Sequence, residues 1–134
     1  MANALYDTGR EAFLLGDIDM AVDTIKAVLI DTGVYTVNLA THDFYNDVSA
    51  GAVGTPVTLT SKTTAAGVFD AADTTFTSVT GATVEALIIY KDTGTPSTSQ
   101  LIAYIDTGTG LPVTPNGGDI LISWSSATER IFKL

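Results

Sequence analysis

The chain has 134 residues, enough for one domain with its own core, and its fifteen acidic and six basic residues give a formal net charge of −9. Because it has no cysteine, disulfides and thiolate metal sites are excluded, and the acidic balance with singly scattered lysines and arginines argues against binding to nucleic acid. We also expect no membrane span, since no apolar run approaches the roughly 18 residues required, and no secretory signal, since "MANALYDTGR" lacks a basic region followed by an apolar one.

The N-terminal segment, residues 1–19, predicts a short helix or an arm. "NALYDTGREAFLL", residues 3–15, has Asn3 as a candidate N-cap and Gly16 as a stop, although Gly9 in its middle disfavours a helix. Its apolar residues are many for a free terminus: Leu5, Tyr6, Phe13, Leu14 and Leu15. They predict an interface with a neighbouring subunit or another protein. The alternative is that they close one end of the domain's own core.

From Thr24 onward the pattern changes to short runs rich in branched and aromatic residues. "TIKAVLID" and "VYTVNL", separated by Asp31-Thr32-Gly33, predict a hairpin. "TPVTLTSKT" alternates apolar and hydroxyl residues, as does a strand with one face in water, and "FTSV" predicts a further short strand.

The last fifty residues carry the clearest strand signals. "TVEALIIYKD" and "SQLIAYID" predict two strands joined by the loop "TGTPSTS". Asn116-Gly117-Gly118 predicts a turn before a strand over Asp119–Trp124, and "SSAT" then turns the chain into a final strand, "ERIFKL". Short strands at spacings near ten residues are typical of a β-sandwich or small barrel. We therefore predict one mainly all-β domain, an antiparallel β-sandwich or small barrel over residues 24–134.

Four Asp-Thr-Gly triplets, at Asp7, Asp31, Asp92 and Asp106, raise the question of an aspartic protease. A chain this short would have to dimerise, so that each subunit supplies one carboxylate to a proton-sharing pair. After Asp106 the chain lacks the apolar-apolar-Gly segment that a retroviral-type protease needs behind its catalytic loop. The triplets are better explained as strand ends, where aspartate accepts from the backbone two residues on and glycine permits the turn. A dimeric protease remains a remote alternative.

Other catalytic and metal-binding patterns are weak. The single histidine, His42, has no nucleophile motif beside it and cannot form a zinc site alone. For calcium, the pairs Asp17 with Asp19 and Asp70 with Asp73 offer oxygen ligands but lack the spacing of an EF-hand loop. Tyr90, Tyr104, Trp124 and Phe132 are expected in the core, although exposed aromatics on one face would favour a carbohydrate site. We therefore predict no catalytic residues, no cofactor and no metal.

Two stretches carry a resemblance to a known group of proteins. "GDIDMAVDTIKAVLIDTGVYTVNLATHDFYNDVSA" and, more specifically, "ALIIYKDTGTPSTSQLIAYIDTGTGLPVTPNGGDILISW" with the terminal "IFKL" resemble small structural proteins of tailed-phage and prophage virions. The resemblance implies a non-enzymatic virion protein, made in the cytoplasm of the bacterial host. Small β-domains of this kind often decorate capsids, so it implies a decoration, or cement, protein on the capsid surface. Its partners would be the major capsid protein and itself, as a homotrimer. The alternative is a tail or fibre tip, or another receptor-binding or glycan-binding module.

Overall fold

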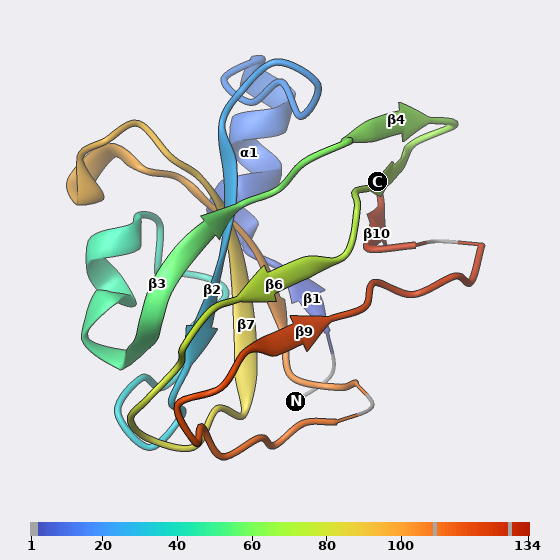
Figure 1. Ribbon diagram of the computed structural model, residues 1–134. Coiled ribbons are helices and arrows are strands. Elements are labelled where there is room, and N and C mark those ends of the chain that lie inside the picture. Colours follow the sequence, from blue (N-terminus) through green and yellow to red (C-terminus); the bar gives the residue numbers. More distant parts are fainter. Residues whose placement is uncertain (1–2, 109, 129) are drawn as a thin grey trace.

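A computed structural model of the chain describes residues 3–108, 110–128 and 130–134. Glu129, the first residue of the predicted last strand, and Met1 and Ala2 of the predicted arm lie outside the described residues. Within the described residues the chain is mainly β, with antiparallel sheets and one short α-helix near the N-terminus, which confirms the predicted fold class (Figure 1). The elements are β1 (Ala4–Leu5), α1 (Asp7–Leu15), β2 (Ile25–Ile30), η1 (Tyr45–Asp47), η2 (Ser49–Gly51), β3 (Ala52–Thr58), β4 (Thr63–Ala65), β5 (Val68–Asp70), β6 (Thr74–Phe76), β7 (Ala86–Lys91), η3 (Pro96–Thr98), β8 (Leu101–Ile105), β9 (Ile120–Ile122) and β10 (Phe132–Lys133).

The central layer is a five-stranded antiparallel sheet with the order β1-β8-β7-β2-β3. There are also two small sheets. One has the strand order β10-β5-β4, and the other pairs β6 with β9. Both edges of the main sheet are unpaired within the described residues, because β1 pairs only with β8 and β3 pairs only with β2. The arrangement is therefore layered rather than a closed barrel.

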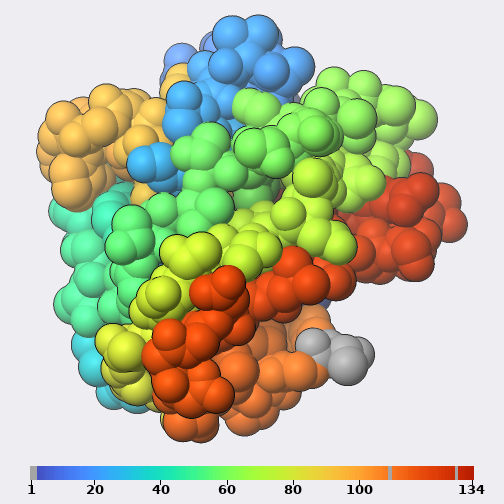
Figure 2. Space-filling view, in the orientation of Figure 1, coloured from blue at the N-terminus to red at the C-terminus, as the bar shows by residue number. Residues whose placement is uncertain are grey.

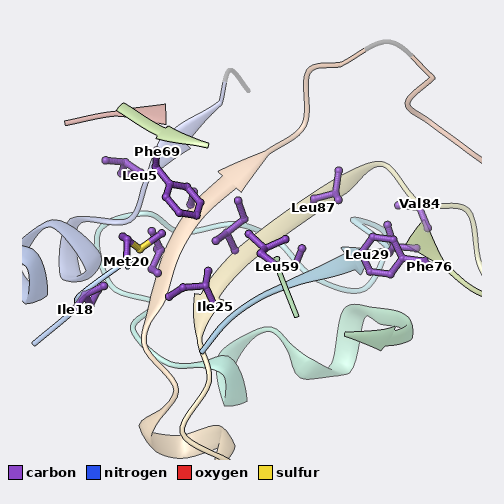
Figure 3. Packing of buried hydrophobic residues seen from close by; sticks show 14 of the residues in the cluster. Leu5, Ile18, Met20, Ile25, Leu29, Leu59, Phe69, Phe76, Val84 and Leu87 are labelled. Carbon is purple, nitrogen blue, oxygen red and sulfur yellow. The ribbon is translucent and has the colours of Figure 1, made fainter. Parts of the chain in front are cut away.

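The two central strands β2 and β7 are buried on both faces, which explains their nearly unbroken apolar sequences. Ile25, Ala27 and Leu29 of β2 enter one core cluster, while Val28 and Ile30 enter another, as the two-residue period of a strand requires. The first cluster includes residues of the small sheets, among them Phe69 of β5 and Phe76 of β6 (Figure 3).

The second cluster lies under the long connection from β2 to β3. It joins Tyr6, Tyr35 and Val48 to β2, β7 and β8, and Tyr45 stacks on Tyr90 with ring centroids 4.5 Å apart. The predicted hairpin over "TIKAVLID" and "VYTVNL" is wrong, because residues 34–39 form no strand and β2 pairs with β3 and β7 instead. The chain leaves the sheet here because the Tyr35 N–H donates to the Asp31 carbonyl at 3.0 Å and the Tyr35 side chain is buried.

The N-terminal helix is shorter than the sequence predicted. It begins at Asp7 after Tyr6 as N-cap, so Asn3 is not the cap, but it ends at Gly16 in the left-handed conformation, as predicted. Residues before it form β1, where Ala4 pairs with Tyr104 and Leu5 with Ala103. The Asn3 side chain instead accepts from the N–H groups of Asp106 and Thr107, each at 3.0 Å, and so ties the chain start to the end of β8.

The predicted strands of the C-terminal half are confirmed. β7 and β8 pair as a hairpin around the loop over residues 92–100, and β9 follows Gly117, which has a φ of +87°. The Gly118 N–H donates to the Asn116 side-chain oxygen at 2.9 Å, which is the predicted turn chemistry. No helix in the described part of the chain is long and apolar enough to span a membrane.

Candidate interface at the end of helix α1

The predicted interface residues separate into a buried and an exposed group. Leu5 and Tyr6 lie in the core of this chain, with 9% and 0% exposed, and Phe13 is half-buried against Phe132. Leu14 and Leu15, in contrast, are 89% and 67% exposed at the end of α1. Leu5 and Tyr6 thus belong to the domain's own core, whereas Leu14 and Leu15 stay candidates for the predicted interface.

Val22 adds a third exposed apolar side chain that the sequence did not single out. It is 79% exposed and lies in the loop that follows α1 (Figure 2, blue). That loop is fixed, because the Asp19 carboxylate accepts from the N–H groups of Ala21 and Val22 and the Asp17 N–H donates to the Ala12 carbonyl. A turn of this kind ordinarily carries polar residues. The apolar Val22 after Asp-Met-Ala was therefore the sequence signal that could have identified this exposed residue. We define Leu14, Leu15 and Val22 as the α1-end patch.

The edge of the α1-end patch is acidic and anchored to the sheet. The Lys91 ammonium contacts the Asp23 carboxylate at 3.1 Å and the Asp17 carbonyl oxygen at 2.6 Å. Burial would raise the pKa of Asp23, but the Asp19 N–H and the ammonium groups of Lys91 and Lys62 bring it below its usual value. An apolar patch with an ionised rim on a fixed loop is the arrangement found at protein–protein contacts.

The four Asp-Thr-Gly triplets take three different structural roles. Asp31 and Asp92 follow β2 and β7, and their carboxylates accept from the N–H groups of Gly33 and Gly94 at 2.8 and 3.0 Å, as predicted for strand ends. Gly94 has a φ of +87°, which favours glycine, whereas a Cβ at Gly33 would meet only the Asp31 carboxylate, at 2.9 Å. Asp106 follows β8 and is held through its N–H by Asn3.

The first triplet departs from the prediction, since Asp7 begins α1 and pairs with Arg10 at 3.0 Å. Asp31 and Asp106 lie at the same end of the main sheet, but β7 separates their strands by two strand spacings, about 10 Å. Within one chain the two strand ends are therefore not adjacent, and the dimeric protease, with one carboxylate from each subunit, stays a remote alternative.

His42 lies at the partly exposed end of a series of hydrogen bonds that begins at the buried Tyr6. Its Nδ1 accepts from the Asn38 N–H at 3.3 Å, so the Tyr35 hydroxyl, 2.7 Å away, donates to it, and the Tyr6 hydroxyl, 2.9 Å from Tyr35, donates in turn. Burial and the hydrogen bond to Tyr35 raise the pKa of Tyr6, so its hydroxyl stays protonated. These hydrogen bonds hold the connection from β2 to β3 over the second core cluster. Among the described residues, no serine or threonine hydroxyl is hydrogen-bonded to the His42 ring.

The carboxylates considered for calcium are spread over separate contacts. Asp19 closes its own turn, Asp70 lies 3.9 Å from the Arg130 guanidinium, and Asp73 accepts from the Trp124 N–H at 3.1 Å. Within residues 3–108, 110–128 and 130–134, no group of three histidine, aspartate or glutamate side chains is placed to hold a metal ion.

Comparison with known proteins adds nothing to these observations. No protein-family model matches the chain, and no curated protein matches it either. The function proposed below therefore rests on the residues, on their geometry and on the resemblance given in the sequence analysis.

Proposed function

We propose that the protein is a non-enzymatic structural component of a tailed-phage virion, and specifically a decoration protein that binds the outer surface of the head. The observation that carries the proposal is the α1-end patch. Three apolar side chains, each at least 67% exposed, come from one continuous segment at one end of the molecule. The sequence resemblance to small virion proteins supplies the biological setting.

The major capsid protein is the partner that this function requires. Burial of an apolar side chain contributes about 1.5–3 kcal/mol, so the three residues of the α1-end patch supply a modest affinity per copy. Three copies around a lattice symmetry axis would bind together, and avidity would then replace a large single interface. We therefore propose a homotrimer, with each copy contributing its α1-end patch to the shell.

A second function, receptor or glycan binding at a tail or fibre tip, is favoured by one observation. Trp124 is only half-buried, and it borders an open groove. Its indole N–H already donates to the Ala72 carbonyl and the Thr74 hydroxyl, at 3.1 and 3.2 Å, so the ring is fixed as a stacking surface.

The test compares binding to heads assembled without this protein. The double variant Leu14→Gln, Leu15→Gln removes apolar surface without adding charge, and we expect its affinity to fall by about tenfold or more, as for central interface residues. Val34→Gln is the matched control, because Val34 is 59% exposed and lies outside the patch.

Cryo-electron reconstruction of the complete virion distinguishes the two functions. Density for this domain at regular lattice positions on the head supports decoration, and density at a tail or fibre tip supports adsorption. Equal binding of heads by the wild-type protein and the double variant would refute the role of the α1-end patch.

A further inference from the structure

A second surface feature lies where the three sheets meet without joining. An open groove of about 1040 Å³ is bordered by β1, β9 and β10. Within the described residues each of these strands has a single partner strand, β8, β6 and β5 respectively. All three are therefore edge strands, and an edge strand presents backbone N–H and C=O groups that are free to pair with a further strand.

The groove is lined by both apolar and polar residues. Leu87 and Ala103 of the main sheet reach it from the core, with 2% and 3% of their surface exposed. Leu121 of β9 stands on the wall and is 61% exposed. Figure 2 shows the segment after β8 in orange and the C-terminal segment in red. Both segments contribute lining residues to the groove. An extended chain would place alternate side chains in such a groove.

The charged side chains among the described lining residues are all basic, whereas the molecule as a whole is acidic. Arg10, Arg130 and Lys133 line the groove, and they are three of the chain's six basic residues. None of the chain's fifteen acidic residues is among the described lining residues. Asp7 contacts Arg10 at 3.0 Å and Asp70 contacts Arg130 at 3.9 Å, and neither aspartate lines the groove. Both ion pairs are partly exposed to solvent and therefore weak. Basic side chains, the exposed Leu121 and three strand edges therefore lie around one groove.

We propose that this groove binds an extended, acidic segment of a partner protein, which adds as a strand along the free edges. Its carboxylates would pair with the cations of the groove, and its alternate apolar side chains would cover the exposed Leu121. The proposal concerns residues other than the α1-end patch, and it does not depend on the position of the protein in a virion. Backbone pairing alone accepts almost any extended chain, so the charged and apolar side chains of the groove must supply the specificity. The proposal therefore predicts that binding depends on the amino-acid composition of the segment.

The probe is a bead-displayed library of random peptides about eight residues long, enough for a strand of typical length. Full-length protein is used to select binders, and one enriched peptide is then titrated by calorimetry against variants. We expect enriched peptides to alternate aspartate or glutamate with apolar residues. Leu121→Glu places a carboxylate on the groove wall and should weaken binding by about tenfold or more, since opposed like charges are costly at an interface.

Matched controls keep the test specific. Val34→Glu introduces the same charge at a site of similar exposure, 59% against 61%, and should leave the affinity unchanged. Lys133→Gln should weaken binding, whereas Lys62→Gln removes an equal charge away from the groove and should not. Circular dichroism of each variant checks that it is folded.

Three outcomes overturn the proposal. One is enrichment of neutral or basic peptides, or of none. Another is equal affinity of Leu121→Glu and Val34→Glu for the enriched peptide. The third is an oligomer of the protein alone that Leu121→Glu dissociates in sedimentation, because the occupant would then be a second copy of this chain.

Discussion

At the residue scale, two glycines serve close approach rather than an unusual backbone angle. Gly51 leaves room for the Tyr35 Cβ, which a Cβ at this position would approach to 2.7 Å, and Gly9 leaves room for the backbone of β8. A Cβ at Gly9 would lie 2.6 Å from the Leu101 carbonyl oxygen, which belongs to a strand and cannot move away easily. A glycine that weakens the isolated helix is therefore what allows α1 to pack on the main sheet.

We predict that Gly9→Ala destabilises the protein although alanine is the better helix former. The propensity gain is about 1 kcal/mol, but the clash with a fixed backbone costs typically 1–3 kcal/mol in a packed site. Urea unfolding followed by circular dichroism measures the difference. Glu11→Ala, at an exposed position of the same helix, is the control and should change stability by less than about 0.5 kcal/mol. A Gly9→Ala variant as stable as the wild type would contradict the close approach.

At the scale of elements, two ion pairs join the start of β2 to the end of β7. Lys26 contacts Asp92 and Lys91 contacts Asp23, each at 3.1 Å. Burial would raise the pKa of Asp92, but the Gly94 N–H, the Lys26 ammonium and the Ser99 hydroxyl lower it below its ordinary 3.8. Asp43 behaves oppositely, because burial, the hydrogen bond with Asp47 and the charge of Asp47 raise its pKa.

These directions predict opposite pH dependences for two isosteric changes. A lowered carboxyl pKa means that the stabilisation is complete above about pH 4 and is lost as the pH falls through the folded-state value. Asp92→Asn should therefore lower stability at pH 7, by about 1 kcal/mol or less for a partly exposed pair, and the difference should vanish in acid.

Asp43→Asn should raise stability at pH 7, because ionised Asp43 opposes folding, and this gain should also disappear as the pH falls. Urea unfolding at several pH values between 2 and 7 (about five points) checks both variants against the wild type. Parallel profiles for the two variants would contradict the assigned directions.

At the scale of the whole molecule, charge is distributed unevenly. The net charge is −9, yet half of the basic residues border one groove that no described acidic residue lines. Acidic groups elsewhere repel one another, and this repulsion acts over distances that salt can screen.

We predict that the melting temperature rises by a few degrees between about 0.01 and 0.1 M sodium chloride, as the Debye length falls from about 30 to about 10 Å. Calcium chloride at the same ionic strength should give the same increase if no cation site exists. Differential scanning calorimetry measures both. A further rise specific to calcium would revive the Asp17–Asp19 and Asp70–Asp73 interpretations, and a fall with sodium chloride would show that ion pairs outweigh repulsion.

The sequence by itself determined those features that depend on a few neighbouring residues. The unbroken apolar runs of β7 and β8, the stop at Gly16 and the turn at Asn116-Gly117-Gly118 all follow from local preference, and they were sufficient for the fold class. Local chemistry also gave the turns at Asp31 and Asp92.

Only the tertiary structure decided which segments pair and which surfaces remain uncovered. β1 has two residues and too little pattern to be recognised, and "VYTVNL" alternates like a strand although Tyr35 is withdrawn into the core by Tyr6 and His42. The separation of Leu5 and Tyr6 from Leu14 and Leu15, and the groove between three edge strands, arise from contacts far apart in sequence. No local pattern carries such information, because burial is a property of the packed chain.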